Sequence, residues 1–120
     1  MQKSILIVDD DKDTAESIKT VLEKEGFAVD VVHNGAHALQ NVGQKNYAII
    51  FMDIMMPLLS GVKVVKMLRE RLSKKTVIVY CSAVPQSDVD LTDVDGFLQK
   101  PVSKQQVIGM TRRFIPVRSP

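Results

Sequence analysis

The chain has 120 residues, of which 45% are hydrophobic and 25% are charged, and its formal net charge is +2. These values are typical of one globular domain with a single core. The small net charge does not indicate a nucleic-acid-binding surface. The sequence has no apolar run of the ~18 residues that a membrane span needs. Because the only cysteine, Cys81, lies in an apolar run and no signal-peptide pattern opens the chain, we expect a reducing, cytoplasmic location without a membrane or nucleic-acid partner.

Short apolar runs alternate with segments of helical periodicity along the chain. The apolar runs predict strands at residues 3–8, 27–32, 47–52, 77–81 and 97–98. Helices are expected between them and after the last strand, where Ser103 can act as the cap. Asp13 and Glu16 have the spacing of a capping box for the first helix, and Gly26 is its expected stop. Alternating strands and helices with right-handed connections predict a doubly wound parallel sheet with helices on both faces.

Residues 83–96 fit this alternation poorly. They include four aspartates, a proline and several β-branched residues, which are all unfavourable in helices. We therefore predict a fourth helix that is shortened to one or two turns, or replaced by a loop, between residues 85 and 92. If a turn forms, Ser87 or Asp88 is expected to cap it. A segment this short would hold only by docking its apolar residues against the sheet edge; these are Val89 and Leu91.

Polar residues follow the strands at the edge where open α/β sheets bind their ligands. Asp9, Asp10 and Asp11 follow the first strand, Asp53 the third, Ser82 the fourth and Lys100 the fifth. Crowded carboxylates repel one another and raise each other's pKa unless a cation lies between them, and Mg²⁺ prefers such oxygen ligands. A carboxylate, a hydroxyl and a lysine around that cation predict phosphoryl transfer, with Asp53 as the nucleophile. Asp11 is expected to cap the first helix instead.

The same residues resemble the receiver domain of bacterial two-component response regulators, over essentially the full chain. The matching segments are Asp9-Asp10, Asp53-x-x-Met56-Pro57-x-x-x-Gly61, Ser82-Ala83 and Phe97-x-x-Lys100-Pro101. The resemblance implies a flavodoxin-like sheet of five strands in the order 2-1-3-4-5. It also implies that Asp53 takes a phosphoryl group from a histidine kinase, a phosphotransfer protein or a small phosphodonor and then switches an output surface. Residues 1–116 would form this domain and residues 117–120 a tail or the start of a linker.

The resemblance further implies a role for each site residue. Asp10, Asp53 and the Met55 main-chain carbonyl would bind Mg²⁺ directly, and Asp9 would act through water. Ser82 and Lys100 would contact the phosphoryl group, and Phe97 would change rotamer together with Ser82. Such a domain catalyses only its own phosphorylation and dephosphorylation, so we do not expect an enzyme. We expect the Lys100–Pro101 peptide bond to be cis and phosphorylation to reorder residues 84–95.

The chain departs from the family pattern at three places. The spacing from Ser82 to Lys100 is shorter than usual, and the missing residues fall in the fourth helix, which normally forms part of the output surface. Met55 and Val84 are both apolar at positions that tune the lifetime of the phosphorylated form in the family. Phe97 lacks the hydroxyl of the tyrosine that is often found there, so its movement would be a packing event only.

Three other functions compete with that of a receiver. A Mg²⁺-dependent phosphohydrolase would usually carry its nucleophile after the first strand and would need a cap domain. A flavodoxin-like cofactor binder would need a phosphate loop rich in Ser, Thr and Gly where this chain has three aspartates. A phosphorylation-independent interaction module would typically have lost a site residue, and none is missing. His33 and His37 lack the spacing of metal ligands, so we expect both on the surface.

Overall fold

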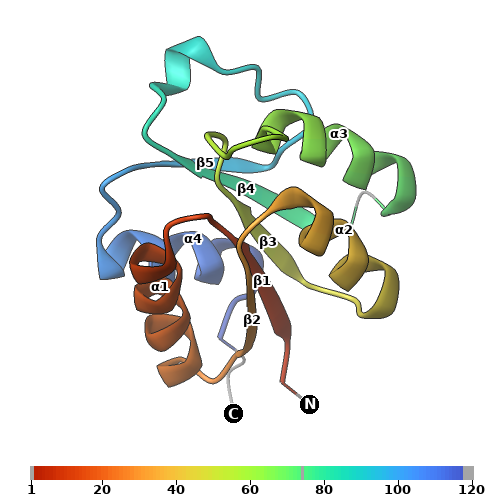
Figure 1. Ribbon diagram of the computed structural model, residues 1–120. Helices are drawn as coiled ribbons and strands as arrows, with labels where there is room; N and C mark the ends of the chain where they lie inside the picture. The colour runs from red at the N-terminus through yellow and green to blue at the C-terminus, as the bar shows by residue number, and fades with distance from the viewer. Residues whose placement is uncertain (1, 74, 118–120) are drawn as a thin grey trace.

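The computed structural model describes residues 2–73 and 75–117. Its strands are β1 (Ser4–Val8), β2 (Ala28–Val32), β3 (Ile49–Met52), β4 (Val77–Ser82) and β5 (Gly96–Gln99). They form one parallel sheet in the order β2-β1-β3-β4-β5 (Figure 1), which confirms the predicted topology. The predicted tail at residues 117–120 lies outside the described residues apart from Val117, so that domain boundary stays a prediction.

Helices cover both faces of this sheet. They are α1 (Lys12–Lys24), α2 (Gly35–Gln44), α3 (Gly61–Arg71) and α4 (Lys104–Phe114), with α1 and α4 on one face and α2 and α3 on the other (Figure 1). Successive residues of β1 therefore enter different cores: Ile5 packs on the α1/α4 side, and Leu6 on the α2/α3 side. Because both faces of each central strand are covered, these strands are apolar throughout instead of alternating with polar residues.

The first helix begins earlier than the sequence predicted. Asp11 is its N-cap, and the Asp11 carboxylate accepts hydrogen bonds from the main-chain N–H of Asp13 and of Thr14. The capping box predicted for Asp13 and Glu16 is therefore wrong, whereas the capping role expected of Asp11 is confirmed. Asp11 stands at the end of the acidic turn in an extended conformation, so its side chain reaches the free N–H groups first. Gly26 ends this segment with φ +96°, as a glycine stop requires.

The connection between β4 and β5 contains only one short turn, η1 (Gln86–Asp88), which is a 3-10 helix of three residues. The prediction of a shortened fourth helix is thus confirmed. The predicted cap is wrong, because Pro85 occupies the N-cap position and no side chain accepts a hydrogen bond there. Val89 and Leu91 are partly buried against the α2/α3 core, as expected.

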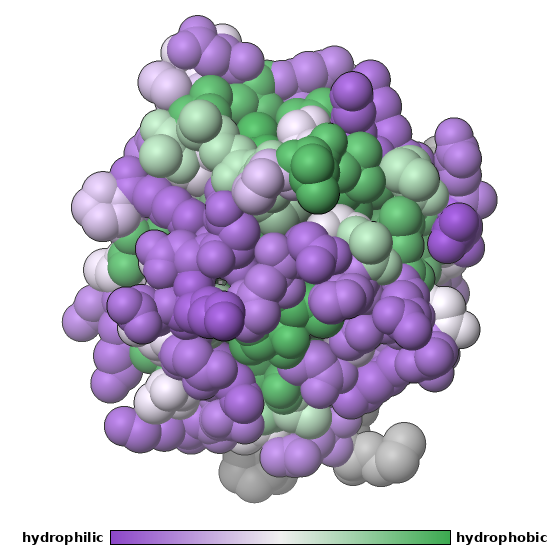
Figure 2. Space-filling model, in the orientation of Figure 1, coloured by the Kyte–Doolittle hydropathy of each residue, from purple (hydrophilic) through white to green (hydrophobic). Residues whose placement is uncertain are grey.

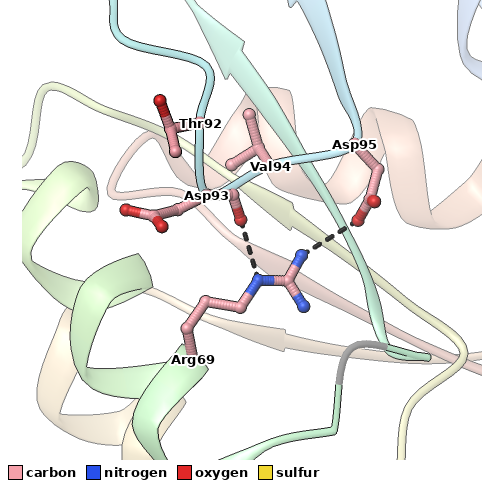
Figure 3. A pocket seen from close by; sticks show the side chains of 5 residues that line it. All are labelled: Arg69, Thr92, Asp93, Val94 and Asp95. Atoms are coloured by element: carbon pink, nitrogen blue, oxygen red, sulfur yellow. Dashed lines mark hydrogen bonds and ion pairs between the residues drawn. The ribbon is translucent and has the colours of Figure 1, made fainter.

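The Arg69 side chain, from α3, binds the C-terminal end of the β4–β5 connection (Figure 3). Arg69 donates from Nε to the main-chain oxygen of Asp93 at 2.7 Å and from Nη2 to the Asp95 carboxylate at 2.9 Å. Its Nη1 donates to the Thr76 main-chain oxygen at 2.8 Å, just before β4. The same Asp95 oxygen also accepts from the Ile78 N–H at 2.9 Å. One guanidinium therefore joins α3, the start of β4 and the end of a connection that has little regular structure of its own.

Candidate functional site

The carboxylate of Asp53 stands at the carboxyl end of the central strand β3. Asp53 is 4% exposed, and its main-chain N–H donates to the Val8 carbonyl at 2.9 Å, so it continues the pairing of β3 with β1. The start of α3 presses against this point, since the Gly61 N–H donates to the Ile54 carbonyl at 2.8 Å. A Cβ atom at Gly61 would overlap the Asp53 main-chain oxygen. Only glycine therefore lets α3 close over the chain that follows the carboxylate.

Two further carboxylates from the end of β1 join Asp53. Carboxylate oxygens of Asp9, Asp10 and Asp53 lie within 4.8 Å of one another, although Asp9 is 2% exposed and Asp10 lies open to solvent. Lys100 reaches them from the loop after β5: its Nζ is 2.8 Å from Asp9 Oδ2 and 3.6 Å from Asp53 Oδ2. The Asp11 N–H donates to the other Asp9 oxygen at 2.9 Å. Lys100 thus contacts two of the three carboxylates.

This arrangement disturbs the ionisation of the buried groups. Burial, followed by the charge of Asp9, raises the pKa of Asp53 to about 7. Burial by itself would lower the pKa of Lys100, but the hydrogen bond and charge of Asp9 and the charge of Asp53 raise it. The Lys100 ammonium is therefore held charged, while burial and the neighbouring Asp9 carboxylate favour the neutral form of Asp53.

The ends of β4 and β5 complete the site. Ser82 is fully buried; its Oγ accepts from the Val84 N–H at 3.1 Å, and its carbonyl accepts from the Lys100 N–H at 2.8 Å. The Lys100–Pro101 bond is cis, which confirms that prediction. Gln99 also belongs here, because its side-chain amide donates to the carbonyls of Ser82 and Ala83 at 3.0 Å each. No motif in the sequence singles out Gln99.

The remaining predicted residues lie around these groups. The Met55 N–H is 3.3 Å from Asp53 Oδ1, which places the Met55 main chain beside the carboxylate while its side chain is 63% exposed. Phe97 is half-buried in the α2/α3 core, opposite Tyr80 of β4, so its predicted link to Ser82 rests on the resemblance alone.

The two histidines of the chain lie in different surroundings. His33 is partly buried, and its Nδ1 lies 2.9 Å from the main-chain oxygen of Asp9. His37 is exposed, as expected. The signal that could have found His33 is its place directly after β2, because β2 is the neighbour of β1 in the sheet and the two strands end at the same edge.

Figure 2 shows hydrophobic residues gathered in the upper half of the molecule, in a surface that is otherwise mostly polar. Two exposed apolar residues follow Asp53 directly in the β3–α3 loop: Met55, and Leu58, which is fully exposed. Leu58 also has φ +70°, a left-handed conformation that is unusual for a leucine. The loop that follows Asp53 therefore exposes two apolar side chains to solvent.

The comparison with known protein families identifies the fold and its general role. The chain matches the family model of the response regulator receiver domain over residues 5–112. This chain belongs to the response regulator receiver family. Such domains are the phosphoacceptors of two-component signalling, which favours a receiver over a phosphohydrolase and over a flavodoxin-like cofactor binder.

Two relatives with similar sequences are transcriptional regulatory proteins. The receiver is 31% identical over 116 residues to a transcriptional regulatory protein, the CpxR homolog of Haemophilus influenzae, covering 92% of this chain and 49% of that protein. It is 32% identical over 112 residues to the transcriptional regulatory protein SrrA of Staphylococcus aureus, covering 90% of this chain and 46% of that protein. The chain thus spans about half the length of these relatives.

Solved structures show the same fold. A CheY-like receiver domain from Methylobacillus flagellatus matches with a TM-score of 0.86 and 29% identity, over 95% of this chain and 99% of that one. The response regulator TrrA of Thermotoga maritima, solved in complex with Mg(2+)-BeF, matches with a TM-score of 0.86 and 29% identity, over 94% and 99% of the two chains. In the part of this receiver that the structure describes, no helix is both long and apolar enough to cross a membrane.

Proposed function

We propose that Asp53 is the phosphoacceptor of this receiver and that the reaction depends on Mg²⁺. The observation that carries the proposal is the charge imbalance at the site. Oxygens of three carboxylates lie within 4.8 Å of one another, and Lys100 is the cation that contacts two of them. A further anion cannot approach such a group unless more positive charge is supplied, and a hard divalent cation with oxygen ligands supplies it.

The residues present fit such a cation. Asp10 is exposed, so its carboxylate can turn toward the cation. Asp53 offers Oδ2, because its Oδ1 accepts from the Met55 N–H. Both carboxylate oxygens of Asp9 already accept hydrogen bonds, one from Lys100 and one from the Asp11 N–H. This agrees with Asp10, Asp53 and the Met55 carbonyl as direct ligands and with Asp9 acting through water. A bound Mg²⁺ would supply charge neutralisation for the carboxylates and for the incoming phosphoryl oxygens.

In the proposed step, an Asp53 carboxylate oxygen forms a bond to phosphorus as the bond from phosphorus to the donor breaks. With a phosphohistidine donor, the P–N bond breaks and the imidazole leaves with its electron pair and takes up a proton. The Lys100 ammonium would contact an oxygen of the new phosphoryl group, since it already lies 3.6 Å from the Asp53 carboxylate. Ser82 Oγ accepts from Val84 and keeps its own proton to donate to a phosphoryl oxygen.

We propose a sensor histidine kinase or a phosphotransfer protein as the donor, with a small phosphodonor as the laboratory substitute. The exposure of Met55 and Leu58 in the loop after Asp53 supports a protein partner, because apolar side chains exposed together mark contact surfaces. Autophosphorylation and dephosphorylation would be the only catalysis of the domain. We further propose that the output is an unidentified domain or partner and that the reaction takes place in the cytoplasm.

Intact-mass measurement after incubation with acetyl phosphate tests this proposal. We expect the mass of one added phosphoryl group with Mg²⁺ and none with EDTA, and we expect Asp53→Asn to abolish it. Asp10→Asn should slow the reaction strongly, because the cation loses a ligand.

Asp11→Asn is the matched control for these variants. Asp11 lies in the same acidic turn but caps α1, and asparagine caps helices equally well, so phosphorylation should continue at the rate of the unchanged protein. A phosphoryl mass that persists in Asp53→Asn, or that does not depend on Mg²⁺, would refute the proposal.

A further inference from the structure

The residues at the end of β2 form hydrogen bonds with both the main-chain N–H and the main-chain carbonyl of Asp9. The Asp9 N–H donates to the carbonyl of Val32 at 3.1 Å, and the Asp9 carbonyl lies 2.9 Å from the Nδ1 atom of the next residue, His33. The Asp9 side chain has other partners, since Lys100 contacts one of its oxygens and the Asp11 N–H the other. His33 therefore acts on the main chain of the acidic turn and not on its carboxylates.

The contact fixes the tautomer of the ring. A carbonyl oxygen only accepts, so Nδ1 of His33 must carry the proton and donate it. His37 has the opposite arrangement. The Asn34 side-chain oxygen accepts from the His37 main-chain N–H at 2.8 Å, which turns the Asn34 amide nitrogen toward His37 Nδ1 at 3.4 Å. Nδ1 of His37 is then an acceptor, and its proton is on Nε2.

We propose that His33 is a positioning residue of the acceptor site, acting through the peptide unit that joins Asp9 to Asp10; the proposal rests on the function proposed above. The carbonyl that His33 holds and the N–H of Asp10 belong to this one planar unit. Asp10 is exposed, so the direction of its carboxylate depends on the orientation of that plane. By fixing the plane, His33 keeps the Asp10 carboxylate among the other two, where a cation would need it.

Three variants of the full chain separate this role from a general effect on folding. His33→Ala removes the donor, and we expect it to weaken Mg²⁺ binding by about two- to tenfold, the value of one hydrogen bond. His33→Asn places an amide N–H where Nδ1 stood and should restore most of the affinity. His37→Ala changes the other histidine of the chain and should leave the affinity unchanged. Mg²⁺ affinity is measured from the amide NMR shifts of the acidic turn during titration, in the absence of any phosphodonor.

The tautomers provide a second readout, which tests the contact between His33 and the Asp9 carbonyl directly. Nitrogen-15 NMR of the two rings at a pH where both are neutral should show His33 protonated on Nδ1 and His37 on Nε2. The same Mg²⁺ affinity in His33→Ala as in the unchanged protein, no rescue by His33→Asn, or a proton on Nε2 of His33 would each overturn the proposal. A protein that binds no Mg²⁺ would overturn it as well. If Mg²⁺ affinity follows the expected pattern while Asp53 takes no phosphoryl group, the role of His33 stands and the proposed function fails.

Discussion

Replacing Arg69 by alanine should lower the free energy of unfolding by about 3 kcal/mol. The substitution removes three hydrogen bonds of 2.7 to 2.9 Å. Water only partly reaches the main-chain acceptors of Asp93 and Thr76, whereas the bond to Asp95 is exposed and that carboxylate keeps its hydrogen bond from the Ile78 N–H. Such a loss costs about 1–3 kcal/mol per acceptor. We use about 1 kcal/mol for each because the Arg69 and Asp95 side chains are 18% and 35% exposed, so water replaces part of what is lost.

Urea and thermal unfolding measure this effect. For a domain of this size, a loss of about 3 kcal/mol corresponds to a fall in the melting temperature on the order of 10 °C. The urea m-value should stay unchanged, since the same surface is exposed on unfolding. Hydrogen exchange should accelerate most at residues 89–95, which the guanidinium fastens to α3.

Two further variants test whether the forked guanidinium causes the effect. Arg69→Lys keeps the charge but reaches only one acceptor at a time, so its stability should lie between those of alanine and arginine. Arg71→Ala is the control on the same helix: Arg71 is exposed and makes no hydrogen bond or ion pair with other described residues, so its loss should cost less than about 0.5 kcal/mol. The reasoning is refuted if Arg69→Ala is no less stable than Arg71→Ala, or if lysine replaces Arg69 without cost.

Three further predictions concern other parts of the receiver. Gly61→Ala should lower the free energy of unfolding by about 1–3 kcal/mol and slow phosphorylation, because the added Cβ would overlap the main-chain oxygen of Asp53. Gly109→Ala has nothing within 4 Å of its added Cβ and should instead stabilise the domain by about 0.5–1 kcal/mol. Equal effects of the two substitutions in urea unfolding would contradict this reasoning. Burial alone would raise the pKa of Asp30, but the hydrogen bond from Tyr47 and the nearby lysine lower it overall, so Asp30 contributes stability above about pH 4 that is lost as the pH falls through its lowered pKa. The stability difference between the unchanged protein and Asp30→Asn should therefore be present at pH 7 and shrink at pH 3, and a difference independent of pH would show that the ionised form does not matter. Beryllofluoride, as a phosphoryl mimic, should change hydrogen exchange at residues 83–88 more than in the rest of the β4–β5 connection, and a uniform change would show that the clamped end moves too.

The sheet and the carboxylate cluster could be predicted because their signals are local in the sequence. Each buried strand is a continuous apolar run, and in a parallel sheet all strands end at the same edge, so Asp9, Asp53 and Lys100 had to meet there. The missing helix was also predictable, since its residues disfavour a helix by their own propensity.

Contacts between distant side chains could not be predicted in the same way. Arg69 precedes its partner Asp95 by 26 residues, and nothing in a helix with several basic residues distinguishes the arginine that faces the connection from those that face water. His33 and Gln99 act through main-chain carbonyls, which every residue carries, so the residue types at both ends of the contact say little. The capping box predicted for Asp13 and Glu16 is wrong because Asp11 and Asp13 can both cap a helix, and only the extended backbone of Asp11 decides between them.

The two ends of the β4–β5 connection have different anchors, and this limits what phosphorylation could move. The first end is tied to the acceptor site, because Ser82 Oγ accepts from the Val84 N–H. If Ser82 turns toward a phosphoryl group at Asp53, that hydrogen bond is lost and the chain after Ser82 is released. The other end is held by Arg69 and by the pairing of Asp95 with Ile78, neither of which involves the site. Rearrangement should therefore be confined to the first half of the connection, a narrower region than the span of residues 84–95 that the sequence suggested. An output surface in this receiver would then comprise the short η1 turn and its neighbours, with α3 and the clamped segment serving as its fixed base.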